Sequence, residues 1–158
     1  MSADGTTGIA DWTERFQGTR ALPRAVRDRL IRAARIVRLE KGTQVFGPDN
    51  VPDRLFFLYD GRIRVSQTSE GGREIVLYRV EAGDSCVLTT ACMLAFEDYS
   101  AEGIAETDVQ AVAIPRATFD DLVGRSPVFR QFVFAAFSQR ITDLFALIDN
   151  IVFQRMDV

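Results

Sequence analysis

Hydrophobic and polar residues change their spacing twice along this chain, and the changes divide it into three regions. Residues 9–36 have a helical pattern, with Pro23 at a first-turn position. The apolar face of that predicted helix carries Val26, Leu30, Ala33 and Ala34. From residue 37 to about 114 the period is two, which is typical of strands. From residue 126 to the end there is no glycine and no proline after Pro127, so this region can form one long helix that Ser126 caps.

The middle region predicts a sheet fold. Its strand-like runs are TQVF, RLFFLY, RIRVSQ, REIVLYRV, AEGIAET and VQAVAI, and turn-forming pairs such as Asp60-Gly61 and Gly71-Gly72 separate them. Many short strands at this spacing favour a jelly roll or barrel. We therefore predict a mainly β fold with flanking helices: a double-stranded β-helix (jelly-roll) barrel over 37–125. Helices at 9–36, a dimerisation helix at 126–158 and a disordered stretch at 1–8 complete the prediction.

The last helix carries a heptad seam. Its members are spaced 3, 4, 3, 4 and 3 residues apart, and they are Phe134, Phe137, Ile141, Leu144, Ile148 and Ile151. A second apolar face, suited to packing on the barrel, contains Phe129, Phe132, Val133 and Phe145. A helix with two apolar faces usually needs two partners, so we predict a parallel homodimer through the seam. The alternative is a helix that packs only on its own barrel.

Composition excludes several classes of function. The chain has 158 residues, which suits one domain, and its formal net charge is −3 at pH 7. It contains no histidine, which disfavours Ser-His-Asp hydrolases, the usual zinc sites and most haem sites. We expect no metal and no cofactor. The basic residues are spread along the chain, so we expect no nucleic-acid interface in this piece. It has neither a membrane-length apolar run nor a signal peptide, and we expect a cytoplasmic protein.

Three stretches of the chain carry a family resemblance: KGTQVFGPDNVPDRLFFLYDGRIRV, GREIVLYRVEAGD and AETDVQAVAIPRATFDDLV. They resemble the sensory half of the Crp/Fnr family of bacterial transcription regulators. The resemblance covers about three quarters of the chain. It implies a cyclic-nucleotide-binding-type barrel, a dimerising helix and a non-catalytic, effector-sensing role. In the family a helix-turn-helix domain that reads DNA follows the dimerising helix, so we expect DNA binding only through a C-terminal domain absent here.

The segment GDSCVLTTACMLAFEDYSAEG lies where the family places its phosphate-binding cassette. Cyclic-nucleotide binders use a Gly-Glu pair and an arginine there. The alignment puts Val87 and Leu88 at the Gly-Glu positions and Tyr99 at the arginine position. A buried phosphate needs a cation or free backbone amides. We therefore predict that the chain does not usefully bind cyclic AMP or cyclic GMP, unless Arg62, Arg64 or Arg79 replaces the missing arginine.

The same segment supports two interpretations of what is sensed. The first is a pocket for another, uncharged or partly apolar, small molecule. Its candidate residues are Cys86, Leu88, Thr89, Thr90, Cys92, Tyr99 and Ser100. The second is thiol redox sensing by Cys86 and Cys92, although a helical segment would hold their Cα atoms about 9 Å apart, too far for a disulfide. The alternative to the pocket is a closed barrel interior without a ligand, and the alternative to redox sensing is that both cysteines are buried structural thiols.

A small β-barrel enzyme of the cupin type is the alternative function. It shares the general barrel shape but ordinarily uses a histidine metal site, and the absence of histidine counts against it.

Overall fold

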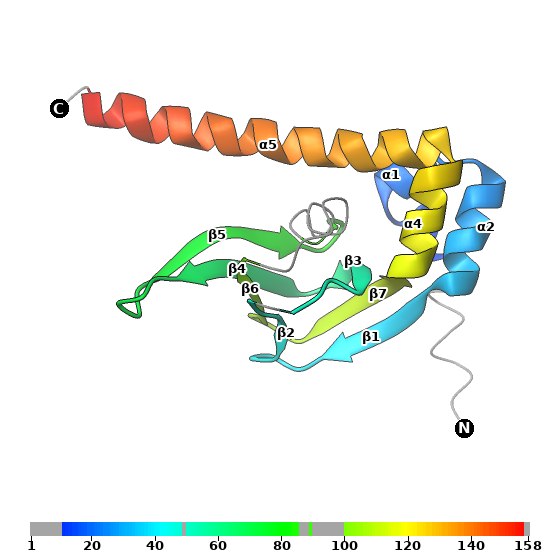
Figure 1. The fold of residues 1–158 in the computed structure, drawn as a ribbon, viewed down its shortest axis with the longest axis horizontal. Coiled ribbons are helices and arrows are strands. Elements are labelled where there is room, and N and C mark those ends of the chain that lie inside the picture. The colour runs from blue at the N-terminus through cyan, green and yellow to red at the C-terminus, as the bar shows by residue number, and fades with distance from the viewer. Residues whose placement is uncertain (1–10, 49, 86–88, 90–99, 157–158) are drawn as a thin grey trace.

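The computed structural model describes residues 11–48, 50–85, 89 and 100–156. In these ranges two antiparallel sheets lie at the centre, short helices cover one end, and a long C-terminal helix runs past the sheets (Figure 1). The predicted fold class, a jelly-roll-type β fold with flanking helices and a long C-terminal helix, is confirmed.

The first sheet has the order β1-β7-β3. Its strands are β1 (Arg35–Leu39), β7 (Val109–Pro115) and β3 (Arg54–Asp60). The central strand β7 pairs antiparallel with both neighbours, for example through Val37 with Ala111 and Phe57 with Val112.

The second sheet has the order β2-β6-β4-β5. Its strands are β2 (Gln44–Phe46), β6 (Glu102–Ala105), β4 (Arg62–Thr68) and β5 (Glu74–Glu81). Strand β4 follows β3 through Gly61, whose φ of 95° lies in the left-handed region that favours glycine. The pairing of β4 with β5 shifts between Val65 and Ser66, which is a bulge in the ladder.

Strand β3 contributes to two separate cores. Successive side chains of a strand point to opposite faces. Phe56 and Leu58 therefore join the barrel core with residues such as Val65, whereas Leu55 and Phe57 join a second core on the helical side. Because both faces of β3 are covered, its central residues are all buried. Strand β3 thus forms the wall between the barrel interior and the helices.

Within the described residues, four short helices build the helical side. They are the 3₁₀ helix η2 (Trp12–Glu14) and the α-helices α1 (Gln17–Arg20), α2 (Arg24–Ala33) and α4 (Arg116–Arg125). Arg27 of α2 donates a 3.0 Å hydrogen bond from Nε to Oγ1 of Thr13 and pairs with Glu14. These contacts fix the N-terminal segment against α2.

Helix α5 (Pro127–Met156) begins as predicted, because Oγ of Ser126 accepts a 3.1 Å hydrogen bond from the backbone N–H of Phe129. Its first turns bury Phe129 and Val133 in the helical core. A helix of 30 residues is about 45 Å long, and its C-terminal part extends beyond the short helices (Figure 1).

The six strand-like runs all form strands, whereas two elements and one packing interpretation were predicted wrongly. Strand β1 starts at Arg35, inside the range assigned to helices. Helix α4 occupies the end of the range assigned to the barrel, because Phe119 and Leu122 recur at helical spacing and are buried. Phe145 does not pack on the barrel, since 63% of it is exposed. The predicted disorder at residues 1–8 lies outside the described residues.

Candidate functional site

The predicted effector residues lie in the cassette segment, only part of which the structure describes. Cys86, Leu88, Thr90, Cys92 and Tyr99 lie outside the described residues, so the pocket and redox interpretations stay predictions. Of the same group, Thr89 is fully buried, and Ser100 is exposed two residues before β6. The backbone carbonyl of Ser100 accepts a hydrogen bond from Nε2 of Gln67 at 3.3 Å.

Ser100 borders a hollow of about 330 Å³ at the end of the second sheet. Its other lining residues include Ser66, which is fully buried and whose Oγ has no hydrogen-bond partner among the described residues. Strict strand alternation would place Ser66 on the outer face, the same face as Arg64. The sequence pattern therefore did not predict that Ser66 is buried. The ladder shift next to it accompanies this departure from alternation.

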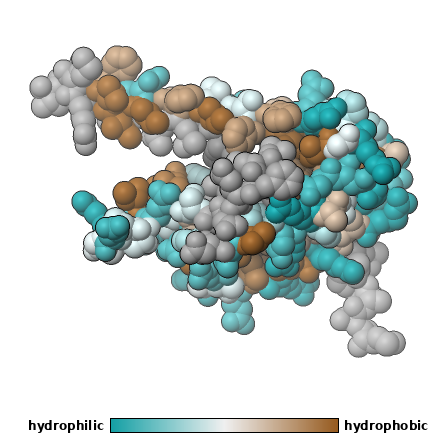
Figure 2. All heavy atoms as spheres, in the orientation of Figure 1, coloured by the Kyte–Doolittle hydropathy of each residue, from teal (hydrophilic) through white to brown (hydrophobic). Residues whose placement is uncertain are grey.

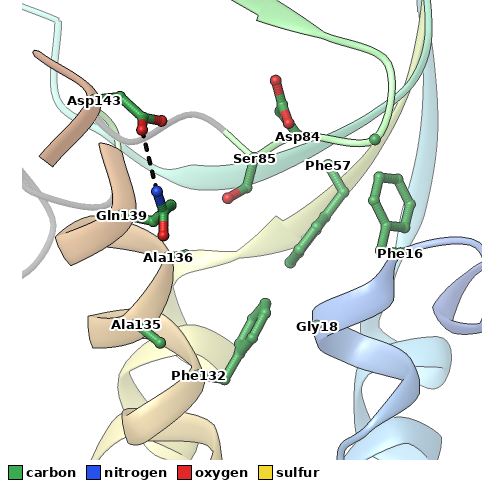
Figure 3. Close-up of a pocket in the computed structure, with 11 residues that line it drawn as sticks. Phe16, Gly18, Phe57, Asp84, Ser85, Phe132, Ala135, Ala136, Gln139 and Asp143 are labelled. Carbon is green, nitrogen blue, oxygen red and sulfur yellow. Dashed lines mark hydrogen bonds between the residues drawn. The ribbon is translucent and has the colours of Figure 1, made fainter. Parts of the chain in front are cut away.

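A larger cavity, of about 680 Å³, lies between the barrel wall and α5 (Figure 3). We call it the α5 cleft. Its described lining consists of Phe16, Gly18, Phe57, Gly83, Asp84, Ser85, Phe132, Ala135, Ala136, Gln139 and Asp143. The volume lies within the range of roughly 300–1,000 Å³ usual for small-molecule sites. A narrow apolar recess adjoins it and reaches Leu55 and Phe137.

Four parts of the chain supply the described lining: the start of α1, strand β3, residues 83–85 and helix α5. Phe57 projects from the helical face of β3, and the backbone holds Ser85 next to it, because the two residues form an antiparallel bridge. The carbonyl of Asp84 also accepts a hydrogen bond from the N–H of Leu58 at 2.9 Å. Helix α5 supplies the opposite wall through Phe132, Ala136 and Gln139 (Figure 3).

The cleft has an aromatic end and a polar end. Phe16, Phe57 and Phe132 lie together. The ring centroid of Phe57 is 5.4 Å from that of Phe16 and 6.4 Å from that of Phe132. At the other end Nε2 of Gln139 donates a 3.1 Å hydrogen bond to Oδ1 of Asp143 (Figure 3). The described lining includes two aspartates and no lysine or arginine. Among the cleft and recess residues, sequence analysis had named Phe132, Val133 and Phe137 as apolar positions of the last helix, and Gly83, Asp84 and Ser85 only as the start of the cassette segment.

The arginines proposed as replacements for the cassette arginine lie elsewhere. Ile63 and Val65 of β4 are buried in the barrel core, so Arg62 and Arg64 occupy the opposite face. Arg62 pairs with Glu106 at 3.3 Å and Arg64 with Glu74 at 2.8 Å. Arg62 and Arg64 therefore lie on the exterior of the barrel and do not point into it.

Glu106 is the centre of this outer charge cluster. Nε of Arg79 donates a hydrogen bond to its Oε1 at 2.7 Å. Burial by itself would raise the pKa of Glu106, but the Arg79 hydrogen bond and the charges of Arg79, Arg62 and Arg64 outweigh it and lower that pKa. Glu106 is thus ionised and binds two of the three arginines.

The described residues form no cluster of three or more potential metal ligands. Among the same residues, no helix combines the length and apolar character needed to cross a bilayer.

Figure 2 shows where apolar side chains reach the surface. Brown atoms follow the C-terminal half of α5, and others lie on the part of the second sheet below it. The exposed apolar residues of α5 include Phe134, Phe145, Ile148, Ile151, Val152 and Phe153. Three of these belong to the predicted seam; Phe137 and Ile141 are half-buried, and the Leu144 side chain lies outside the described set.

Comparison with solved structures gives a consistent fold. A Eubacterium rectale protein described as a transcriptional regulator of the Crp/Fnr family superposes with a TM-score of 0.76 at 23% identity, over 87% of this chain and 64% of that one. The catabolite activator protein of Thermus thermophilus gives 0.69 at 20% identity, over 86% and 63%. The sensor domain of the transcriptional regulator DNR from Pseudomonas aeruginosa gives 0.70 at 17% identity, over 90% and 93%.

This chain therefore spans just under two thirds of the first two regulators and nearly all of the isolated sensor domain. No curated protein matches the sequence. The model of the cyclic nucleotide-binding domain matches residues 36–126, which is more than half of the 158 residues. The match begins at the second residue of β1 and ends where α5 is about to start, so it contains the rest of the two sheets and α4. The chain belongs to the cyclic nucleotide-binding domain family.

Proposed function

We propose that this chain is the effector-sensing and dimerisation domain of a Crp/Fnr-type transcription regulator, and that its effector is not cyclic AMP or cyclic GMP. One observation carries the second part. Residues 80–115 contain no basic residue, and Arg62 and Arg64 are paired on the outer face of the barrel. A nucleotide phosphate in the barrel would therefore lack a cation from the cassette and from these two arginines.

The cost of that lack can be approximated. A charge-assisted hydrogen bond typically contributes about 1.5–3 kcal/mol. Without the cassette arginine and glutamate, binding is weaker by roughly 3–6 kcal/mol, or about two to four decades of affinity. A dissociation constant of about 1 μM would become roughly 0.1–10 mM.

Calorimetric titration with cyclic AMP and cyclic GMP tests this. We expect no saturable heat below millimolar concentrations. A dissociation constant below about 10 μM would overturn the proposal. If Arg62→Ala or Arg64→Ala then abolished that binding, an arginine would have turned inward to contact the phosphate. Arg38→Ala is the matched control, because Arg38 is an exposed arginine of the other sheet.

The homodimer part of the proposal rests on α5. Its C-terminal half carries seam residues Ile148 and Ile151, of which 53% and 48% remain exposed. Burying a large aliphatic side chain contributes about 1.5–3 kcal/mol, and the six seam residues of two helices together give roughly 18–36 kcal/mol. Even half of that value exceeds the lower part of the association cost of about 4–15 kcal/mol. A second copy of α5 is the natural partner for a heptad seam.

Light scattering on Ile148→Glu/Ile151→Glu tests the dimer. Both side chains are already exposed, so the change should yield folded monomers. Ala146→Glu/Asn150→Glu adds the same charge to exposed positions of the helix outside the seam, and it should remain dimeric. A seam variant that stays dimeric would refute the seam as the interface.

Regulation of DNA is proposed for a longer protein that contains this domain. The domain itself has a net charge of −3 and should not bind duplex DNA tightly or in a salt-sensitive way. Native mass spectrometry of the isolated protein would detect a retained ligand, and a loss of two hydrogens would reveal a disulfide between Cys86 and Cys92.

A further inference from the structure

The α5 cleft lies outside the barrel. Phe57, which lines it, belongs to the helical core together with Phe16, whereas the neighbouring Phe56 and Leu58 belong to the barrel core. Opposite faces of one strand therefore serve the two spaces. A molecule in the cleft would contact the outer side of β3 and would not occupy the barrel interior, where the family's nucleotide site is expected.

The aromatic end of the cleft suits a flat apolar group. The rings of Phe57 and Phe132 are stacked with an interplanar angle of 13°, and Phe16 meets Phe57 edge-on at 61°. Gly18 makes this arrangement possible, because a Cβ at that position would overlap the Phe132 ring. The recess beyond Phe57 and Ala136 is lined by further apolar side chains. Aromatic rings prefer such offset and edge-on surroundings.

The polar end selects for charge. Ser85, Gln139 and Asp143 supply hydroxyl, amide and carboxylate groups. Asp84 adds a second carboxylate to the lining, which also accepts a 3.3 Å hydrogen bond from the backbone N–H of Glu81, and the described lining offers no cation. A carboxylate attracts a cation and repels an anion, and this effect is stronger near a protein surface than in bulk water because the effective dielectric constant is lower there. We propose that the α5 cleft is a second ligand site, which binds small aromatic compounds whose polar group is positively charged or neutral and rejects anionic ones.

Such a ligand would bridge two parts of the molecule. Ser85 and Asp84 follow β5, whereas Ala136 and Gln139 belong to α5 (Figure 3). One ligand would contact both. The proposal does not depend on the effector proposed for the barrel, because none of the barrel-core residues lines the cleft.

A charge series on one ring tests the proposal. The probes are 2-phenylethylamine, which is protonated at pH 7, neutral 2-phenylethanol and anionic 3-phenylpropionate. The chain has a single tryptophan, Trp12, whose ring centroid lies 5.1 Å from that of Phe57. Fluorescence excited at the red edge of indole absorption therefore reports occupancy, and the probes do not absorb there. For probes of this size we expect dissociation constants on the order of 1 mM.

We expect the amine to bind about tenfold more tightly than the acid at low salt, with the alcohol between them. The difference should fall to less than about threefold in 1 M salt, where the Debye length is about 3 Å. Asp84→Asn/Asp143→Asn should remove it likewise. Asp149→Asn, an exposed carboxylate further along α5 and outside the cleft, should leave it unchanged.

Two further variants locate the probe. Ala136→Leu fills the cleft and its recess and should abolish the fluorescence response, whereas Ala146→Leu makes the same change on the same helix outside the cleft. Equal or tighter binding of the acid, an unchanged response in Ala136→Leu, or no response to any probe would each overturn the proposal. Displacement by cyclic AMP would place the probe in the barrel. Cyclic AMP that binds tightly without displacing the amine would refute only the function proposed for the barrel.

Discussion

Replacing Phe129 by alanine should separate the two halves of α5 energetically. Phe129 is fully buried, and its ring lies 6.1 Å from that of Phe119 and 5.9 Å from that of Phe132. Truncating a buried phenylalanine typically costs about 3–5 kcal/mol, because apolar contact is lost and a cavity remains. The two ring pairs, each contributing about 0.5–1.5 kcal/mol, place Phe129→Ala in the upper part of this range.

Phe145→Ala is the matched control, since the same side chain is truncated on the same helix where 63% of it is exposed. Its effect on folding should be within about 0.5 kcal/mol. Both changes belong in the Ile148→Glu/Ile151→Glu background, so that dimerisation does not contribute to the measured stability.

Urea unfolding followed by Trp12 fluorescence measures both variants, because Trp12 is buried in the same core as Phe129. An unchanged slope with a lower midpoint would show that only stability changed. A loss below about 1 kcal/mol for Phe129→Ala, or an equal loss for Phe145→Ala, would refute the assignment of the first turns of α5 to the core.

Two other changes probe charge and backbone. Arg79 and its neighbours hold the pKa of Glu106 below the ordinary 4.5. The stabilisation by the Glu106 charge is therefore complete above pH 4.5 and disappears as the pH falls through the folded-state pKa. Glu106→Gln should lower the free energy of unfolding at pH 7, and urea melts at decreasing pH should show that the difference from the unmodified chain shrinks in acid. Gly61→Ala should lower the melting temperature more than Gly72→Ala. Both glycines have positive φ, which costs alanine about 1–2 kcal/mol. Only at Gly61 would the added Cβ also collide with a backbone atom, the carbonyl oxygen of Asp108.

The strands were predictable because their information is local. Runs such as RIRVSQ alternate between core and solvent, and Ile63 and Val65 are indeed buried while Arg62 and Arg64 are not. Turn glycines such as Gly61 mark where these runs end. The start of α5 was predictable for the same reason, since Ser126 and Pro127 are a local capping signal.

The α5 cleft was not predictable, because it depends on which face of β3 the helices cover. The run RLFFLY is apolar on both faces, so its pattern does not show that Phe57 and Phe56 enter different cores. Phe145 was misassigned for a related reason. Periodicity shows that a helix has a second apolar face but not how far along the helix its own domain reaches.

The cleft and the proposed dimer seam share one helix, and this leads to a final prediction. Helix α5 is fixed at Phe129, lines the cleft at Ala136 and is exposed at Ile151, about 22 Å further along. A ligand that bridges Ser85 and α5 favours one position of the helix, and the same position sets the geometry of the seam.

We therefore expect 2-phenylethylamine to change the dimer dissociation constant by at least about twofold in analytical ultracentrifugation. Because the dimer would contain two clefts, thermodynamic linkage requires dimerisation to change the affinity of each cleft for the amine by the square root of that factor. Titrating the amine into native dimer and into the monomeric Ile148→Glu/Ile151→Glu variant measures that factor independently, and Ala146→Glu/Asn150→Glu serves as the dimeric control. Equal affinities in monomer and dimer would show that the cleft and the seam are energetically independent.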